Sequence, residues 1–292
     1  RIGIEYGTRY ADFGSRTIVP PDQGKPPFWR ECQPLFQVKF SAFHGNDENY
    51  MAYFKAVNDY GLTWIHGYPS CIMPFASFVA QKGLTFDKPI KAVTASAENL
   101  YDYQRTIIKK AFGVEPHALY SLTEAVACIG EDADHDYIVD EDYSVVELIE
   151  CGDYSRIVGS NLTNFAFPLL RYDTGDLAIT TDRLKNGRRV IERIDGRTGE
   201  LLSLPDGGKV GALSALFTES ATIKEAQIHQ LEDYSVEISF VPLSDNYSED
   251  IAEAEKRFRD RTKGMLPVSF KRVDGIERTK RGKLRYIVSD IK

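Results

Sequence analysis

Two short stretches of the 292-residue sequence combine residue types that could act on a phosphate or a carboxylate. Thr123 and Glu124 place a hydroxyl beside a carboxylate, which could donate to a phosphate oxygen and help to hold Mg²⁺. Lys283 follows Gly282, whose small size lets the backbone approach a ligand while the lysine supplies a compact positive charge. Taken singly, each stretch is also typical of a surface turn or a basic surface segment.

Two further residues carry groups that could form paired hydrogen bonds with a polar ligand. Asp176 follows Gly175, and its two carboxylate oxygens could accept two hydrogen bonds. Arg197 follows Gly196, and its planar guanidinium offers forked donors to a pair of oxygen acceptors. The alternatives are an ordinary hairpin aspartate and a surface arginine in a linker.

The composition is that of a globular chain with a substantial core. Hydrophobic residues make up 42% and charged residues 27%, which excludes disordered, collagen-like and disulfide-scaffold proteins. No signal peptide is visible, so we expect a cytoplasmic protein. No two cysteines form a CxxC pair, which argues against a disulfide framework and a thiolate-only zinc site; they are Cys32, Cys71, Cys128 and Cys151.

Two segments depart from the average charge. Residues 60–81 lack Asp, Glu, Lys and Arg, but Gly and Pro interrupt them, which favours buried core over a membrane span. Residues 256–292 hold thirteen Lys or Arg against four Asp or Glu, although the whole chain has a net charge of −7. This basic end could face nucleotide phosphates, nucleic acid or only solvent. No nucleic-acid-binding motif accompanies it, so we expect neither a nucleic-acid nor a membrane partner.

Helices alternate with strands in the first half of the chain, after an irregular opening rich in Pro and Gly. The pattern predicts a helix from residue 49 to 61, a strand at 62–66, a helix ending at Gly83, a strand at 91–94, a helix at 100–112 and a strand at 118–120. This alternation favours a mainly parallel sheet, which binds ligands at the carboxyl ends of its strands. The turns after Thr94 and Tyr120 are therefore the places to look for a site.

The second half has a different texture. Residues 145–194 read as short strands with a hairpin at Asn186–Gly187, and the residues beyond 200 combine strands with one helix capped by Ser248. We therefore expect an α/β fold: a mainly parallel sheet with helices, followed by a short-strand β subdomain and a small α+β C-terminal domain. The predicted domains are residues 1–196 and 197–292.

Four stretches, in this order, resemble the signature of the adenylate-forming (AMP-binding) ligase superfamily: residues 96–98, 120–124, 171–176 and 278–283. Residues 27–30 and 67–70 resemble the branch that contains phenylacetate-CoA ligases and ligases of capsular polysaccharide biosynthesis. The resemblance spans essentially the whole chain. The family's N-terminal phosphate loop is missing from the sequence, so the resemblance implies a ligase that lacks this part.

The resemblance implies a nucleotide site. Tyr120 would stack on adenine, Asp176 would bind the ribose, and Arg197 would contact ribose and phosphate. The residues that would surround the base are Ser96, Ala97, Glu98 and Ser121. Thr123 and Glu124 would hold phosphate and Mg²⁺.

The resemblance also implies a two-step reaction. Lys283 would act on the carboxylate during adenylation and then withdraw as the C-terminal domain turns near Glu200. A small carboxylic acid would react with ATP to give an acyl adenylate, and the acyl group would pass to coenzyme A or another nucleophile, in a monomer or a homodimer. The alternative is a catalytically inactive fragment that binds nucleotide. Cys128 and His135 match only half of a zinc site found in some relatives, so we expect no structural zinc.

Overall fold

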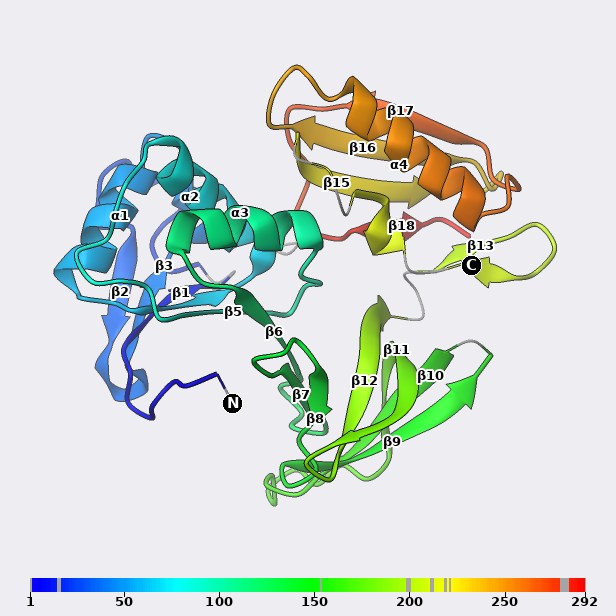
Figure 1. Ribbon diagram of the computed structural model, residues 1–292, viewed down its shortest axis with the longest axis horizontal. Helices are drawn as coiled ribbons and strands as arrows, with labels where there is room; N and C mark the ends of the chain where they lie inside the picture. The colour runs from blue at the N-terminus through cyan, green and yellow to red at the C-terminus, as the bar shows by residue number, and fades with distance from the viewer. Residues whose placement is uncertain are drawn as a thin grey trace.

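The structure, a computed structural model, describes residues 2–14, 17–152, 154–197, 201–210, 213–217, 220, 222–278 and 284–291. Within these residues a 12-stranded mixed sheet forms the body, and a separate four-stranded sheet lies at the C-terminal end (Figure 1). The predicted α/β class with a small C-terminal sheet domain is therefore confirmed. The boundary predicted at residue 196 stays a prediction.

One half of the large sheet is parallel, in the order β3-β1-β4-β5-β6. Three helices connect its strands, and each connection moves in the same direction along the sheet, so right-handed crossovers bring the helices to one face. Figure 1 shows α1, α2 and α3 together above these strands. The elements are β1 (Tyr10–Phe13), β2 (Trp29–Cys32), β3 (Gln37–Phe40), α1 (Tyr50–Asp59), β4 (Trp64–Gly67), α2 (Pro69–Gln81), β5 (Ala92–Ser96), α3 (Asp102–Phe112) and β6 (Pro116–Ser121).

The charge-free segment of residues 60–81 is core, as expected from its Gly and Pro residues. It forms β4 and α2, and Ile72, Phe75 and Val79 repeat at helical spacing on a fully buried face of α2. Pro69 occupies the start of this helix, where a missing amide hydrogen costs nothing. Among the described residues, no helix is both long and apolar enough to cross a membrane.

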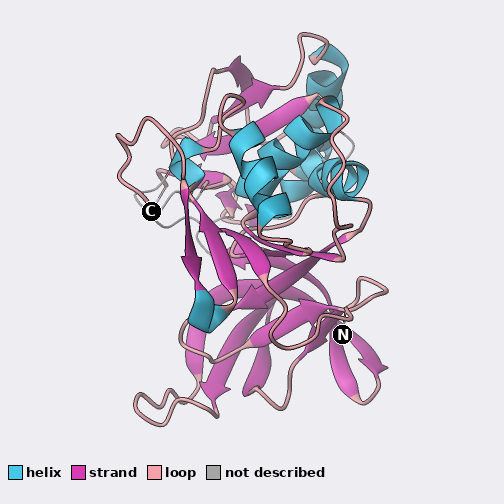
Figure 2. Ribbon diagram, turned by 90° about the vertical axis from the view of Figure 1, so that its left-hand side faces the viewer, coloured by secondary structure: helices cyan, strands magenta, loops and turns pink. Residues whose placement is uncertain are grey.

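The other half of the large sheet is antiparallel, in the order β6-β7-β8-β12-β11-β10-β9. The long β11–β12 hairpin turns at Asn186 and Gly187, whose φ angles of 53° and 76° suit the predicted tight turn. The longer helices lie in the upper part of Figure 2, and the strands of the antiparallel half extend below them. The strands added in this half are β7 (Cys128–Glu131), β8 (Tyr137–Val139), β9 (Ser144–Cys151), β10 (Tyr154–Asn161), β11 (Tyr172–Lys185) and β12 (Arg188–Arg197).

The C-terminal sheet has the order β17-β16-β15-β18 and is covered by α4. Ala254 and Phe258 of α4 are fully buried. The same apolar cluster includes Met73 of α2 and Tyr103 of α3, so the C-terminal sheet packs against the helices of the body. The elements are β13 (Leu202–Ser203), β14 (Lys209–Val210), β15 (Ile223–Gln230), β16 (Val236–Pro242), α4 (Ser248–Arg261), β17 (Val268–Arg272) and β18 (Ile287–Ser289).

Two local predictions were wrong. The opening residues are not irregular throughout, because β1, β2 and β3 join the large sheet, and Ala11 and Phe13 alternate inward as a strand requires. The Pro and Gly residues that suggested irregularity lie in the loop between β1 and β2. Ser248 is also not the cap of α4: the capping position is Tyr247, and no side chain bonds to the helix end there.

Candidate active site

A pocket of about 370 Å³ opens where β5 and β6 end, at the carboxyl edge of the parallel strands. This is the edge at which ligands bind in such sheets, and the turns after β5 and β6 both contribute to it. The turn after β5 contains Ala97 with a φ of 64°, an unusual conformation for a residue with a side chain. Of the residues proposed from the sequence, those that line the pocket are Ala97, Glu98, Tyr120, Ser121, Thr123, Glu124 and Asp176.

Tyr120 and Asp176 meet directly in this pocket. The Tyr120 hydroxyl donates to Oδ2 of Asp176 over 2.7 Å, although the two residues are 56 positions apart. Asp176 is only 7% exposed, and its backbone amide donates to the Thr174 hydroxyl. In the β11–β12 ladder the backbone of Arg197 pairs with that of Asp176. The Asp176 carboxylate is thus held by the Tyr120 hydroxyl, and its backbone lies opposite that of Arg197.

The remaining candidates lie elsewhere or outside the described part. Ser96 ends β5 and is not among the pocket-lining residues; its Oγ lies 3.5 Å from Nε2 of His66. Burial lowers the pKa of His66. The side chain of Arg197 and the whole of Glu200 and Lys283 lie outside the described residues.

The turn that carries Thr123 and Glu124 is supported from β10. The amide of Ala125 donates to the Leu122 carbonyl over 3.0 Å, which closes the turn. Asn161, only 8% exposed, donates from Nδ2 to the Glu124 carbonyl over 3.1 Å. The turn therefore has a fixed backbone position, and the hydroxyl and carboxylate that it carries are held at the pocket.

Gly159 of β10 provides a first test of this support. A Cβ atom at this position would lie 2.0 Å from the backbone oxygen of Val126, so we expect Gly159→Ala to destabilise the fold by about 1–3 kcal/mol through overpacking. Thermal unfolding measures the effect. Gly275→Ala is the control, because nothing lies within 4 Å of its added Cβ. Equal melting temperatures for the two variants would contradict the close contact.

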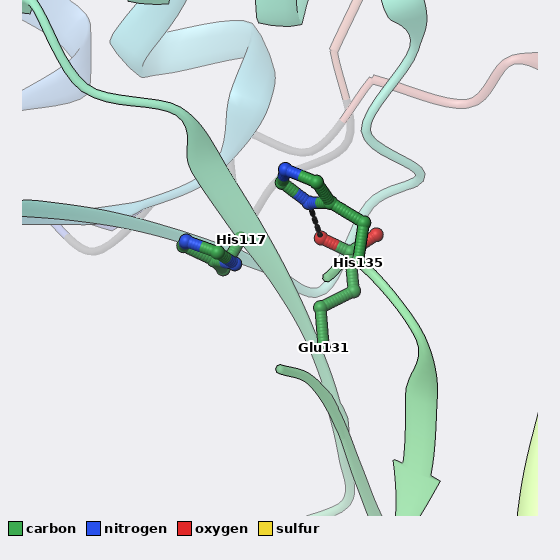
Figure 3. A group of neighbouring side chains, drawn as sticks. All are labelled: His117, Glu131 and His135. Carbon is green, nitrogen blue, oxygen red and sulfur yellow. Dashed lines mark hydrogen bonds and ion pairs between the residues drawn. The ribbon is translucent and has the colours of Figure 1, made fainter. Parts of the chain in front are cut away.

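A polar cluster ties α3 to β6 and β7. Glu131, 4% exposed, accepts from the Ala118 amide over 2.8 Å and forms an ion pair with Arg105 of α3. Nδ1 of His135 lies 3.2 Å from Glu131, and the His135 ring stacks on His117 with 4.8 Å between centroids (Figure 3). Burial lowers the pKa of His117.

The geometry of this cluster could suggest a metal site, since ligand atoms of His117, Glu131 and His135 lie within 4.8 Å of one another. However, the Arg105 guanidinium bonds both carboxylate oxygens of Glu131, and its Nη1 lies 3.4 Å from His135 Nδ1. A cation placed there would be repelled by Arg105. We therefore interpret the cluster as an ion-pair network that positions β6.

Residues of the C-terminal part form a wall of the pocket that the sequence motifs did not indicate. Ala226, Leu284 and Tyr286 line it. The Tyr286 ring lies 5.1 Å from that of Tyr101, and its hydroxyl donates to the Leu213 carbonyl over 3.1 Å. Burial raises the pKa of Tyr286 well above its usual range. Tyr101 and Tyr103 lie in the segment where the sequence predicts a helix at 100–112, and that helical pattern does not indicate a contact with the C-terminal part.

The buried start of α2 gives a second test. Burial, with a smaller contribution from the negative charge of Glu98, raises the pKa of the Cys71 thiol to about 12, whereas Cys151 is exposed. Since the thiolate is the reactive form, iodoacetamide at pH 8 is expected to modify Cys151 well before Cys71. Mass spectrometry of peptides gives the two rates. Comparable rates would contradict the raised pKa of the Cys71 thiol.

Comparisons with known proteins agree with this fold. Residues 202–290 match the protein family described as the CapK C-terminal domain. The chain is 28% identical over 302 residues to the protein CapK of Staphylococcus aureus, covering 99% of this chain and 67% of that protein.

Solved structures of adenylate-forming CoA ligases share the fold at low sequence identity. A 2-hydroxyisobutyryl-CoA ligase in its postadenylation state has a TM-score of 0.69 at 15% identity, covering 99% of this chain and 67% of the ligase. The anthranilate CoA ligase AuaEII also gives 0.69 at 11% identity, covering 97% and 59%. The chain therefore has the adenylate-forming ligase fold.

The arrangement of the parts is informative as well. The same 2-hydroxyisobutyryl-CoA ligase gives TM-scores of 0.54 in an open conformation and 0.51 in its thioesterification state, at equal coverage of this chain. Because these structures share one sequence, the higher score of the postadenylation state reflects how its parts are placed. Of these three structures, the postadenylation one thus shares the fold of this chain over the largest part of its length in space.

Proposed function

We propose that this protein activates a small carboxylic acid with ATP by forming an acyl adenylate and passes the acyl group to coenzyme A or another nucleophile. The observation that carries this proposal is that Tyr120, Asp176 and the Thr123–Glu124 turn line the same pocket at the carboxyl edge of the sheet. These residues come from separate stretches of the chain. Each belongs to a stretch that resembles the ligase superfamily, and here they face one cavity.

Different residues are assigned to the base, the ribose and the phosphate of the nucleotide. The Tyr120 ring offers an apolar face to adenine, and the buried Asp176 carboxylate can accept from both ribose hydroxyls. Arg197, opposite Asp176 in the ladder, is assigned to ribose and phosphate. This division leaves the open side of the pocket for the acid.

The phosphate end of the pocket is assigned to the turn after β6. The Thr123 hydroxyl can donate to a phosphate oxygen, and Glu124 fits Mg²⁺, which prefers one or two carboxylates together with substrate phosphates. Bound Mg²⁺ would neutralise the negative charge of the triphosphate. We assign to Lys283 the positive charge that stabilises the developing charge between carboxylate and α-phosphate.

The named relatives support a CoA acceptor and an acid of modest size. The two ligases with the same fold act, by their names, on 2-hydroxyisobutyrate and anthranilate. We therefore propose coenzyme A as the acceptor and a phenylacetate-like or other small acid as the substrate. The similarity to CapK supports a role in capsular polysaccharide biosynthesis.

Calorimetric titration with AMP tests the nucleotide site without knowledge of the acid. We expect AMP to bind at one site per chain and GMP to bind more weakly, because the exocyclic groups of the two bases differ where the base edge meets the turn after β5. Absence of binding by AMP to the folded protein would contradict the proposed function.

A further inference from the structure

A hydrogen-bonded group joins the C-terminal residues to the rim of the pocket, and the chemistry proposed above does not use its side chains. Ser70, at the start of α2, donates from its amide and its hydroxyl to the two oxygens of Glu98, over 3.1 and 3.0 Å. The carboxylate thus lies at the N-terminal end of a helix, where negative charge is favoured. Burial raises the pKa of Glu98, and the hydrogen bonds from Ser70 oppose this rise.

Two donors from the C-terminal part converge on the same pair. Nη1 of Arg278 donates to the Ser70 hydroxyl oxygen over 3.0 Å, and the amide of Leu284 donates to Oε1 of Glu98 over 3.3 Å. Nη2 of Arg278 also bonds Glu225 of β15 over 2.9 Å, and both of these side chains are largely buried. The contacts therefore form a continuous chain from β15 to the end of β5.

These contacts bracket the segment that contains Lys283. Arg278 and Leu284 lie on either side of residues 279–283 in the sequence, and both contact the Ser70–Glu98 pair. The two ends of that segment are thus attached to the rim of the pocket at one place. A change that separates Ser70 and Glu98 from these donors would release both ends together.

We propose that Ser70, Glu98 and Arg278 are positioning residues that form a latch, which holds the C-terminal part against the pocket during adenylate formation and opens before acyl transfer. The inference rests on the proposed function and adds the side chains that hold the C-terminal part against the pocket. Arg278 is central, because its guanidinium bonds the Ser70 hydroxyl and the Glu225 carboxylate at the same time. Without it the largely buried Glu225 carboxylate loses this ion pair and Ser70 loses its contact with the C-terminal part, which favours the open arrangement.

Hydrogen exchange tests the latch in the protein without substrate. Ser70 and Leu284 amides both donate to Glu98, so mass spectrometry of peptides covering 69–73 and 284–291 reports its opening. We expect Arg278→Gln to speed exchange in both segments about tenfold or more, as for the loss of hydrogen bonds to a charged group. Ser70→Ala keeps the Arg278–Glu225 pair, so it is the milder variant and should speed exchange in the same two segments. Arg272→Gln is the matched control, because its ion pair with Asp245 lies within the C-terminal part.

The two half-reactions give the second readout. In Arg278→Gln, pyrophosphate release should fall about tenfold or more, while thioester formation from a supplied acyl adenylate should be kept or increased. Exchange that stays at the unmutated rate in both segments would overturn the latch, and so would an equal fall in both half-reactions. Failure of the unmutated protein to release pyrophosphate with any acid would instead count against the proposed function, and the exchange rates would still decide the latch.

Discussion

Lys283→Ala is expected to slow acyl-adenylate formation by about 10²- to 10³-fold and to leave thioester formation from a supplied acyl adenylate near the unmutated rate. The reason is that a preorganised positive charge stabilises the charge that develops between carboxylate and α-phosphate only in the first step. Lys283 directly precedes Leu284, whose amide bonds Glu98 at the rim of the pocket. Single-turnover measurements of the two half-reactions separate the steps.

The control for this variant is Lys271→Ala, which removes an exposed lysine of the same basic segment that pairs with Glu237. It should change neither half-reaction. If Lys283→Ala slowed both half-reactions equally, Lys283 would bind ligand uniformly or support the structure, and the assigned role in the first step would be wrong.

Asp176→Ala is expected to weaken AMP binding about 5- to 150-fold, which corresponds to roughly 1–3 kcal/mol for hydrogen bonds to a charged group. Asp176 is buried in the pocket and held there by the Tyr120 hydroxyl. Tyr120→Phe keeps the ring but releases this hydrogen bond, so its loss of affinity should be smaller than that of Tyr120→Ala, which also loses stacking. Calorimetry gives all three dissociation constants.

Asp182→Ala provides the comparison, because Asp182 lies on the same strand with an exposed side chain. Its affinity for AMP should be unchanged. An unchanged dissociation constant in Asp176→Ala would remove Asp176 from the ribose role. If Tyr120→Phe were as damaging as Tyr120→Ala, the hydroxyl and not the ring would carry the contribution of Tyr120.

The elements of the body could be predicted where the chain signals them locally. The helices α1, α2 and α3 have apolar residues at helical spacing, and the Asn186–Gly187 turn needs positive φ angles that these residue types adopt readily. The strands β1 to β3 could not be found in the same way, because each has only four residues and a Pro- and Gly-rich loop separates two of them. Their place in the sheet depends on pairing with distant strands.

The residues of the site could likewise be predicted where the signal is local, but not where it depends on contacts between distant segments. Residues that act through one short motif, such as Thr123 and Glu124, were identified from the sequence and do line the pocket. Contacts between motifs were not, because Tyr120 meets Asp176 across 56 positions and Arg278 meets Ser70 across 208. Sequence order says nothing about which of two distant polar groups will face each other.

Acid-dependent release of pyrophosphate from ATP tests the central claim most directly. The protein is incubated with ATP, Mg²⁺ and a panel of aryl and short acyl acids, and the acyl adenylate is identified by mass spectrometry. We predict that at least one acid stimulates pyrophosphate release, yields its adenylate and gives a thioester when coenzyme A is added. If the folded protein binds AMP but no acid in the panel stimulates release, carboxylate activation by this protein is contradicted.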